Sequence, residues 1–538
     1  MNSPSPINIA IGFHQSALRR GDHLALCVGG TTFRYAAILE RVLALASAIE
    51  AHDPDPEQPT VGMFGYRSAT AYAAVLAILY AGKGYVPLNP HFPVARNLRI
   101  ADLSGIGMLI LDGRCAEGAQ ELLEQMPRPL TVLMPDHAVL PEWTANQSRH
   151  RFISQSELAV VPRTIREPKS PNHGIAYLLF TSGSTGIPKG VMVSQENVQA
   201  FVEGMIERYR PTPEDRFSQH SDMTFDASVY DQFVCWAAGA TLYPVPEEQR
   251  MAPAKFIQEH GITFWESVPA VIDFMRRMHL LRPGAFPSLR WTVFGGERLG
   301  REAARRWQVA APNAVIDNSY GPTEGTICVT GYLWRGDVSD GECLNDIVPI
   351  GLPYPGQMAA LLVDDRLIAN EDGARGELCL AGSQVTPGYW RNPVETEKSY
   401  REMSGPDGMV RRWYRTGDLV EWRDGVGYHY LDRVDRQLKI RGYRVELSEI
   451  EHVLRQVAGS EQVAVIGWPP RGGNVTSVVG FVSGSKVADE EILAEMARRL
   501  PPYMVPKQLQ RLSQLPLNAN NKVDLPRLVE LVEGMTGG

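Results

Sequence analysis

Residues 180–191 of this chain read Phe-Thr-Ser-Gly-Ser-Thr-Gly-Ile-Pro-Lys-Gly-Val, directly after an apolar run that begins at Ile175. The apolar run predicts a buried strand over residues 175–180, so the segment after it would form a loop at the strand's end. Glycines let a backbone approach an anion, and serine and threonine hydroxyls add donors, so the loop suits a polyphosphate. A flexible turn has the same composition, and the spacing does not fit a Walker A loop.

The composition is that of a globular chain with several domains. Its 538 residues are too many for one hydrophobic core. The 53 basic and 61 acidic residues give a net charge of -8 without a long basic run, which argues against a nucleic-acid binder. The six dispersed cysteines predict neither a zinc cluster nor a disulfide framework. Because neither a signal peptide nor an apolar run of roughly 20 residues is present, we expect a cytoplasmic protein that does not bind membranes.

Apolar runs that alternate with helical patterns predict an α/β fold for most of the chain, with parallel sheets covered by helices. A helix over residues 69–81 would begin at Ser68. Glycine, proline and β-forming residues accumulate over residues 354–390, where we expect a small β-barrel-like subdomain. Candidate strands cover residues 60–64, 108–111, 175–180 and 291–294.

The pattern of elements restarts after residue 433. A strand is expected over residues 437–441, followed by a helix whose capping box would be Ser448 and Glu451. We therefore predict a large N-terminal domain over residues 1–433 and a small α+β domain over residues 434–538. Further elements of the small domain are expected over residues 462–466, 476–482 and 490–500.

Five motifs follow the first loop in order. They read Phe-Asp-Ala-Ser at 225–228, Gly-Gly-Glu at 295–297, Asn-Ser-Tyr-Gly-Pro-Thr-Glu at 318–324, Tyr-Arg-Thr-Gly-Asp at 414–418 and Leu-Asn-Ala-Asn-Asn-Lys-Val-Asp at 517–524. On these motifs the chain resembles amino-acid adenylation domains of the nonribosomal peptide synthetase type, within the acyl-CoA synthetase and luciferase superfamily. The resemblance covers nearly the whole chain. It implies ATP-dependent conversion of an amino acid to aminoacyl-AMP with release of pyrophosphate, by an adenylation core and a mobile C-terminal lid.

The same resemblance implies a set of ATP-binding residues. Lys189 would add positive potential near the phosphates, although a solvated loop lysine is the simpler reading of that residue alone. Glu324 would bind Mg²⁺ as a hard oxygen ligand. The residues implied at the β- and γ-phosphates are Thr181, Ser182, Gly183, Ser184, Thr185 and Gly186. Those implied around the adenine are Gly295, Gly296, Glu297, Asn318, Ser319, Tyr320, Gly321, Pro322 and Thr323, with Tyr320 stacking on the base.

Four residues near the end of the core and in the small domain have implied roles as well. Asp418 would accept both ribose hydroxyls, because a carboxylate has two oxygens for the purpose, and Arg433 would lie near the ribose and phosphates. Asp435 corresponds to the family's hinge. Lys522 would be the principal catalytic residue, whose ammonium stabilises the charge of the transferring phosphoryl group. The family's usual glycine before this lysine is replaced by Asn521.

The substrate's α-ammonium group would be bound by Asp226, whose rival role is to cap a helix over residues 229–238. No residue implied at the side-chain pocket is charged, so we expect a neutral, medium-to-large amino acid, which includes aromatic ones. Residues 262–269 also resemble D-alanine–carrier protein ligases, which favour a small substrate. The residues implied to line the pocket are Ala227, Tyr230, Ser267, Val293, Gly295, Ser319, Ile327 and Cys328.

The acceptor of the activated amino acid is implied by the family resemblance alone. No carrier-domain or condensation-domain motif is present, so we expect a free-standing unit that loads the phosphopantetheine thiol of a separate carrier protein. Residues 441–443 would approach the pantetheine tunnel after the lid rotates. Coenzyme A is an alternative acceptor. A non-catalytic sensor would keep the fold without needing Lys522.

Overall fold

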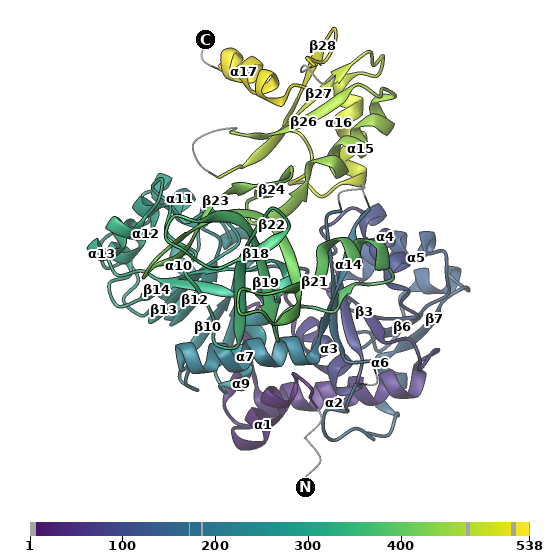
Figure 1. The fold of residues 1–538 in the computed structure, drawn as a ribbon. Coiled ribbons are helices and arrows are strands. Elements are labelled where there is room, and N and C mark those ends of the chain that lie inside the picture. The colour runs from purple at the N-terminus through teal and green to yellow at the C-terminus, as the bar shows by residue number, and fades with distance from the viewer. Residues whose placement is uncertain (1–6, 172, 184–186, 470–473, 518–522, 537–538) are drawn as a thin grey trace. The chain divides into compact units, whose positions relative to one another are not determined.

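The computed structural model contains five sheets and describes residues 7–171, 173–183, 187–469, 474–517 and 523–536 (Figure 1). The chain divides into two compact units. The core unit consists of Met1–Pro90, Ala101–Leu179 and Gly190–Val434. The small unit consists of Asp435–Gly538 together with His91–Ile100 and Phe180–Lys189. The division near residue 434 lies beside the predicted domain boundary, whereas the two short segments were not expected in the small unit.

The first large sheet has eight strands in the order β20-β9-β8-β4-β3-β5-β6-β7. Strands β3 to β7 pair in parallel, as expected for a helix-covered sheet. Helix α3 (Ala69–Tyr80) packs inside the core unit and is buried on every side, and the hydroxyl of Ser68 caps it by accepting from the Ala71 amide. The strands are β3 (Thr60–Phe64), β4 (Gly84–Leu88), β5 (Met108–Leu111), β6 (Thr131–Met134), β7 (Arg151–Ser154), β8 (Ile175–Thr181), β9 (Lys189–Ser194) and β20 (Gly388–Tyr389).

The second large sheet has nine strands in the order β16-β15-β14-β13-β12-β10-β11-β1-β2. Its central strands β11, β10, β12, β13 and β14 are parallel, so their carboxyl ends meet at one edge, where ligands bind in sheets of this kind. The strands are β1 (Leu24–Val28), β2 (Thr31–Arg34), β10 (Arg216–Gln219), β11 (Thr241–Pro244), β12 (Phe264–Ser267), β13 (Trp291–Phe294), β14 (Val315–Tyr320), β15 (Thr330–Leu333) and β16 (Leu352–Pro353).

The third sheet of the core unit is antiparallel and has six strands, so a small β subdomain is present where one was expected over residues 354–390, but it extends to residue 433. Its longest strand, β22, pairs with β19, β21 and β23 and carries Asp418. The strands are β17 (Gln357–Val363), β18 (Arg366–Ile368), β19 (Arg375–Gly382), β21 (Tyr400–Ser404), β22 (Val410–Arg423) and β23 (Gly427–Arg433).

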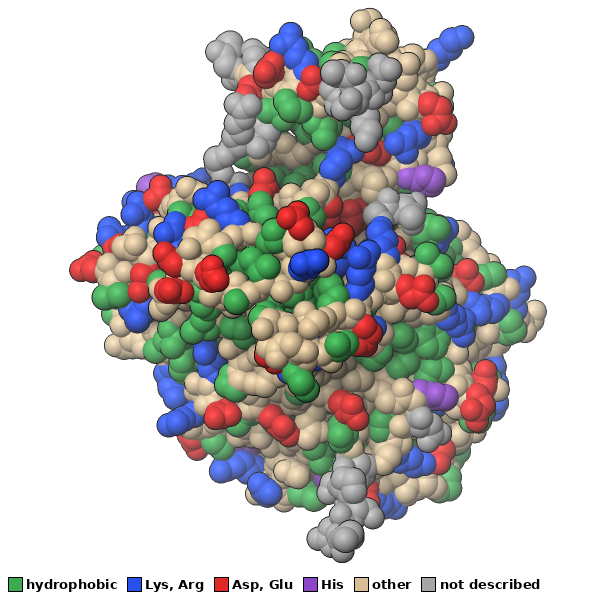
Figure 2. Space-filling view, viewed as in Figure 1, with side chains coloured by type: hydrophobic (Ala, Val, Ile, Leu, Met, Phe, Trp, Pro, Cys, Tyr) green, Lys and Arg blue, Asp and Glu red, His purple; other side chains and the backbone are tan. Residues whose placement is uncertain are grey.

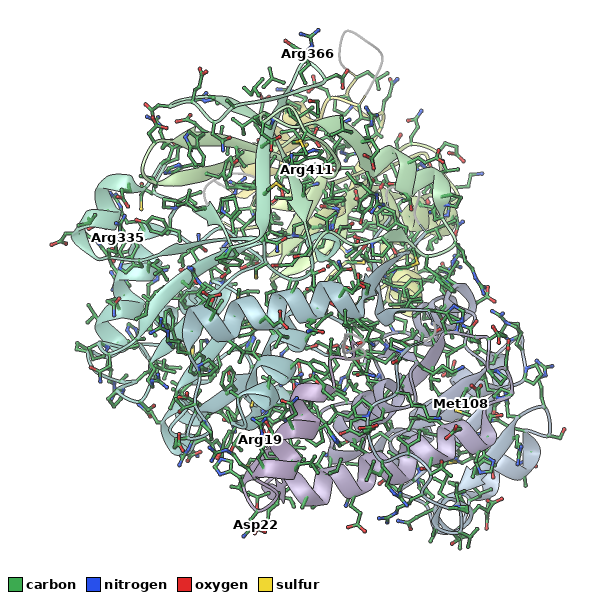
Figure 3. All side chains as sticks on the ribbon, turned by 60° about the horizontal axis from the view of Figure 1, so that its bottom comes forward. Arg19, Asp22, Met108, Arg335, Arg366 and Arg411 are labelled. Carbon is green, nitrogen blue, oxygen red and sulfur yellow. The ribbon has the colours of Figure 1, made fainter. Side chains whose placement is uncertain are left out.

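Helices cover the sheets of the core unit, as the alternation in the sequence predicted (Figure 1). Met108 is buried in its strand, while charged side chains such as Arg335 and Arg366 project to solvent (Figure 3). The remaining helices of the chain before residue 434 are α1 (Ile11–Arg19), α2 (Tyr35–His52), α4 (Val94–Ser104), α5 (Ala116–Gln125), α6 (Gln155–Ala159), α7 (Gln195–Tyr209), α10 (Ala254–His260), α11 (Ala270–Arg277), α12 (Arg301–Ala310), α13 (Asp337–Glu342) and α14 (Pro393–Ser399).

The small unit contains two sheets and three helices after residue 435 in the described ranges. The predicted capping box at Ser448 and Glu451 is wrong, because α15 begins at Leu447 and its preceding residue makes no side-chain cap. Glu451 instead accepts from the Arg436 guanidinium at 2.8 Å. The elements are β24 (Gln437–Ile440), β25 (Tyr443–Glu446), α15 (Leu447–Ala458), β26 (Val463–Trp468), β27 (Ser477–Ser483), α16 (Asp489–Arg499), β28 (Gln508–Leu512) and α17 (Leu525–Thr536).

Surface properties agree with the composition. Acidic and basic side chains alternate over the described part of the face in Figure 2, where no broad basic stripe is visible. No helix in the described part of the chain is long and apolar enough to span a bilayer.

Candidate active site

The described part of the predicted phosphate loop lies in the small unit, directly after β8. The Ser182 hydroxyl donates to the Arg444 carbonyl at 2.8 Å and accepts from the Glu446 amide at 3.0 Å. At Gly183 a Cβ would stand 1.9 Å from the Ile187 carbonyl oxygen, so the backbone there requires glycine. Thr181 ends β8, and its hydroxyl is buried without a hydrogen-bond partner in the described ranges. Ser184, Thr185 and Gly186 lie outside the described residues.

Lys189 begins β9 in the small unit. Burial raises the pKa of the Glu446 carboxyl, and the positive charges of Arg444 and Lys189 partly offset this rise. Lys189 therefore adds positive potential at Glu446, and its predicted role near the phosphates stays a prediction. Lys522 lies outside the described residues, so its catalytic role stays a prediction. Asp435, the predicted hinge, accepts a hydrogen bond from the Gln437 amide at 3.0 Å.

Asp418 and Arg433 face each other across the pairing of β22 and β23. The Arg433 guanidinium donates to Asp418 Oδ1 at 2.5 Å, and the Tyr320 hydroxyl donates to Oδ2. The Asp418 amide donates to the Thr416 hydroxyl at 3.0 Å, which fixes the backbone of the motif. Because each carboxylate oxygen has two acceptor positions, Asp418 retains capacity for further donors such as ribose hydroxyls.

Glu324 lies in a short 3-10 turn, η5 (Thr323–Gly325), and is fully buried. The Tyr389 hydroxyl donates to its Oε1 at 2.7 Å, and the Glu324 carbonyl accepts from the Thr386 amide at 2.9 Å. Magnesium is commonly held by one or two carboxylates plus substrate phosphates. A single oriented carboxylate such as that of Glu324 fits this mode of binding, and no ready-made cluster of three or more His, Cys, Asp or Glu ligands occurs in the described ranges.

The loop after Glu324 is held in an uncommon backbone conformation. Thr326 and Ile327 both have positive φ, of 58° and 73°, which is costly for residues with a side chain, and most of all for β-branched ones. Gln384 stabilises this loop, because its amide donates to the carbonyls of Gly325, Thr326 and Cys328, the last at 2.7 Å. No sequence motif identified Gln384, since it is more than fifty residues from the loop.

The predicted adenine-binding residues converge where β13 and β14 end. A Cβ at Gly295 would approach the Ser319 carbonyl oxygen to 3.2 Å, and one at Gly321 would lie 2.6 Å from the Cys328 Cα. The Asn318 amide donates to the Pro349 carbonyl at 2.8 Å, while the Glu297 carboxylate accepts from the Ala270 amide at 3.1 Å. The side chains of Asn318 and Glu297 therefore support neighbouring loops, and their proximity to adenine stays a prediction. Pro322 precedes η5.

Asp226 immediately precedes α8 (Ala227–Val229) and makes no side-chain capping bond, so the rival role predicted for it is not observed. A hydrogen bond from Thr323 and the nearby charge of Glu324 act on its carboxyl, whose pKa is raised chiefly by burial. The predicted helix over residues 229–238 is interrupted, because residues Tyr230–Val234 form a π-helical turn, η3, before α9 (Cys235–Ala237). Such turns occur frequently at functional sites.

Some of the residues predicted for the side-chain pocket interact with Asp226: the Ile327 amide donates to its carboxyl, and its charge acts on Cys328. Tyr230, Val293 and Ile327 belong to one buried cluster, and Cys328 packs against it. Burial raises the pKa of the Cys328 thiol, and the negative charges of Asp226, Glu266 and Asp317 raise it further. The Ser319 hydroxyl shares a 2.8 Å hydrogen bond with the Tyr354 hydroxyl, a partner that the sequence did not indicate.

Ser267 is the exception, because it points to the other face of β12. Its hydroxyl accepts a 2.9 Å hydrogen bond from the Trp265 indole, and Trp265 packs into a second buried cluster. Successive side chains of a strand alternate between faces, so Glu266 takes the face that Ser267 was predicted to occupy. Glu266 is directly opposite Val293 in the parallel register of β12 and β13. The prediction that Ser267 lines the pocket is therefore wrong by one residue.

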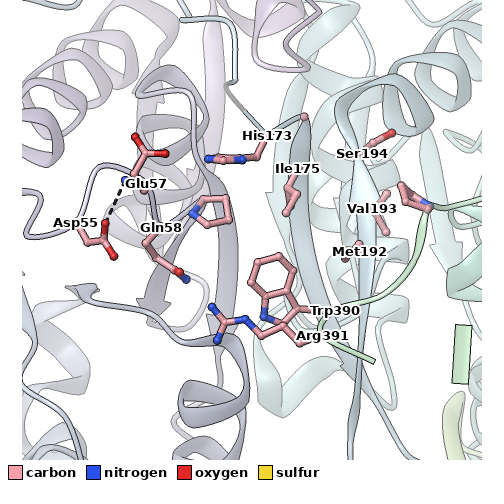
Figure 4. Close-up of a pocket in the computed structure, with 13 residues that line it drawn as sticks. Asp55, Glu57, Gln58, His173, Ile175, Met192, Val193, Ser194, Trp390 and Arg391 are labelled. Atoms are coloured by element: carbon pink, nitrogen blue, oxygen red, sulfur yellow. Dashed lines mark hydrogen bonds between the residues drawn. The ribbon is translucent and has the colours of Figure 1, made fainter. Parts of the chain in front are cut away.

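A separate pocket of about 560 Å³ lies in the core unit between the ends of β3 and β8, with Trp390 and Arg391 at one side (Figure 4). Gln58, His173 and Met192 also line it. None of the predicted site residues belongs to its lining, and the Arg391 guanidinium stacks over the Trp390 ring at 4.9 Å.

Comparisons with known proteins agree with this arrangement. The family model for the AMP-binding enzyme matches residues 13–390, and that for the AMP-binding enzyme C-terminal domain matches residues 449–522. The Vibrio cholerae adenylation domain AlmE, solved with glycyl-adenosine-5'-phosphate, is 30% identical, with a TM-score of 0.88 and 99% of each chain covered. PA1221, a protein containing adenylation and PCP domains, shares the fold at 22% identity, with a TM-score of 0.78 and coverage of 98% of this chain and 84% of that one.

Among curated proteins, tyrocidine synthase 3 of Brevibacillus parabrevis is 31% identical over 97% of this chain, which corresponds to 8% of that protein. The chain spans less than a fifth of the length of such curated relatives. The family models nevertheless cover most of it, and AlmE matches it from end to end. The chain belongs to the AMP-binding enzyme family and is an adenylate-forming ligase of the amino-acid adenylation domain type.

Proposed function

We propose that this chain activates an amino acid with ATP, forms aminoacyl-AMP and pyrophosphate, and transfers the aminoacyl group to the phosphopantetheine thiol of a separate carrier protein. The observation that carries the first step is the arrangement within the core unit. Asp226 and Glu324, the residues implied for the α-ammonium and the metal, lie in or beside short helical turns. Asp418, implied for the ribose, lies on β22 and accepts from the hydroxyl of Tyr320, which ends β14 shortly before Glu324. Thr323 links the first two, because it hydrogen-bonds Asp226 and precedes Glu324.

The chain's own residues would divide the work of the adenylation step. Asp226 would hold the α-ammonium so that the substrate carboxylate is oriented for attack on the α-phosphorus. Asp418 and Arg433 would hold the ribose, and Tyr320 would lie against the base. Mg²⁺ bound by Glu324 would neutralise charge on the phosphates. The buried setting of these groups would keep water from the mixed anhydride.

The acceptor is proposed from the family, since adenylation domains of this type work with carrier domains, and coenzyme A is the alternative. We infer no nucleic-acid or membrane partner, and a cytoplasmic setting. Glycine is a second candidate substrate, because AlmE was solved with a glycyl adenylate. The neutral substrate side chain that the sequence predicted depended on a pocket without charge. Glu266 adds a buried carboxyl to that surface, so this premise does not hold.

The test is amino-acid-dependent exchange of pyrophosphate into ATP, measured across the proteinogenic and common diamino acids. Lys522→Ala should lower exchange by about 100-fold or more, because the transferring phosphoryl group loses its counter-charge, while nucleotide binding by calorimetry persists. Lys507→Ala, which removes an exposed lysine of the small unit, is the matched control and should retain full exchange. Undiminished exchange by the Lys522 variant would remove that residue from its role. Absence of exchange with every amino acid would overturn the proposed function.

A further inference from the structure

Glu266 is a buried carboxyl that the adenylation step does not use. Only 7% of the residue is exposed, although no role was assigned to it by the sequence motifs. It shares its face of β12 with Phe264, which stacks on Phe217 with ring centroids 4.3 Å apart. Both rings belong to the same cluster as Tyr230 and Val293, the residues expected beside the substrate's side chain. Glu266 therefore points toward the side-chain pocket.

Among the residues that the structure describes, no cation forms an ion pair with Glu266. In the described ranges its side chain has one hydrogen bond, donated by the Ser221 hydroxyl to Oε2 at 3.0 Å. The charged side chains on neighbouring elements that interact electrostatically with Glu266 are Asp226 and Asp231, and both are acidic. Arg67 is the cation nearby, but it acts on Asp231. Burial, reinforced by Asp226, raises the pKa of Glu266 to about 7.

The Tyr230 hydroxyl is a second buried polar group close to Glu266. It has no hydrogen-bond partner among the described residues. The charge of Glu266 acts on this hydroxyl, as does the Cys328 thiol. Buried charges in folded proteins are almost always paired with an opposite charge, and buried hydroxyls are almost always hydrogen-bonded. A carboxylate with no cation partner among the described residues, next to an unpaired hydroxyl, therefore indicates a ligand that would complete both. The ligand must donate hydrogen bonds and offset negative charge.

We propose that Glu266 recognises a protonated amine on the substrate's side chain, so that the preferred substrates are diamino acids. The proposal rests on the proposed function and names its substrate class. The α-ammonium would pair with Asp226 and the side-chain ammonium with Glu266 and the Tyr230 hydroxyl. A diamino acid thus brings one cation for each of the two carboxyls, whereas a neutral amino acid leaves Glu266 buried without a partner.

The experiment compares pyrophosphate exchange by the wild-type chain with pairs of substrates of similar shape. The diamino acids are 2,3-diaminopropionate, 2,4-diaminobutyrate, ornithine and lysine, and their neutral counterparts are alanine, homoserine, norvaline and norleucine, with glycine and phenylalanine added. We expect kcat/KM for the best diamino acid to exceed that of its counterpart by about 100-fold, the size of effect that a buried charge pair provides. A wild-type preference for a neutral amino acid would overturn the proposal.

Variants separate recognition from folding. Glu266→Gln should lower kcat/KM for the diamino acid by about 100-fold, mainly through KM, and leave exchange with the neutral counterpart unchanged or higher. Tyr230→Phe should cause a smaller loss of about fivefold, since only one hydrogen bond is removed. Ser267→Ala, on the opposite face of the same strand, should keep the wild-type preference. ATP binding by calorimetry shows that each variant is folded.

The pH profile gives an independent readout. For a diamino acid, kcat/KM of the wild type should rise as Glu266 ionises near pH 7, and Glu266→Gln should remove that rise. The titratable groups that face Glu266 remain in the variant, so their titration is common to both profiles. These groups are Asp226, Tyr230, Asp231 and Cys328. An identical rise in both proteins, or an unchanged substrate order in Glu266→Gln, would overturn the proposal. Exchange with no amino acid at all would instead contradict the proposed function.

Discussion

Asp418 and Glu266 are both buried carboxylates of the core unit, 4% and 7% exposed, yet their surroundings differ. Asp418 has a cation from its own chain, because Arg433 donates to it at 2.5 Å, and Tyr320 donates to its second oxygen. Glu266 has one hydroxyl donor and acidic neighbours. A buried carboxylate that pairs with a cation of its own chain belongs to the interactions of the folded state. A buried carboxylate without such a cation lowers the free energy of unfolding, and a cationic ligand can remove this loss. The comparison thus separates the carboxylate proposed to bind the ribose, whose partners belong to the chain, from the carboxylate proposed to bind a substrate cation.

The largest change in the free energy of unfolding is expected at Asp418, whose ion pair with Arg433 is complete within the chain. Asp418→Ala would leave Arg433, whose side chain is 10% exposed, without its counter-ion, so the free energy of unfolding should fall by about 3 kcal/mol. Urea denaturation monitored by tryptophan fluorescence measures this change. The double variant Asp418→Asn with Arg433→Met is the control, because it removes both charges and should recover most of the loss. A fall below about 1 kcal/mol in the single variant would show that the pair is not a unit of the fold.

The opposite result is expected at Glu266, where removal of the charge should stabilise the chain at high pH. A carboxyl whose pKa rises on folding contributes its stability below the unfolded pKa near 4.5, and this contribution is lost as pH increases through 7. Glu266→Gln should therefore resemble the wild type at pH 5 and exceed its free energy of unfolding by about 2 kcal/mol at pH 8. Denaturant titrations at both pH values measure the difference. Equal differences at pH 5 and pH 8 would mean that Glu266 has a cationic partner.

The two carboxylates also show how far the sequence predicts this molecule. Asp418 was singled out because it ends a long motif, and motifs in fixed order specified the family, whereas the nucleotide-binding roles of their residues stay predictions. The predicted strands at 60–64, 108–111 and 291–294 match the structure, because each is a compact apolar run with clear ends. Glu266 was missed because the side chains of a strand alternate, so an error of one residue exchanges the two faces. No pattern in one sequence determines which of the two faces of such a strand a given residue occupies.

Other omissions have the same long-range origin. Gln384 holds the loop of Thr326 and Ile327 from another part of the chain, and a single sequence carries no signal that joins the two. The capping box at Ser448 and Glu451 was plausible locally, yet the Glu451 carboxylate forms an ion pair with Arg436, which lies just before β24. Local rules identify elements and motifs, but the partners of buried polar groups are decided by packing between distant segments.

The smallest effect is expected at Ser267, the immediate neighbour of Glu266. Ser267→Ala would leave the Trp265 indole N–H buried without its acceptor, so the free energy of unfolding should fall by about 1 kcal/mol. The substrate preference should not change, because Ser267 packs on the face of β12 that lies away from Tyr230 and Val293. Denaturation and pyrophosphate exchange on the same sample measure both quantities. A changed preference with intact stability would place Ser267 in the pocket after all, and would return the prediction of an uncharged lining to consideration.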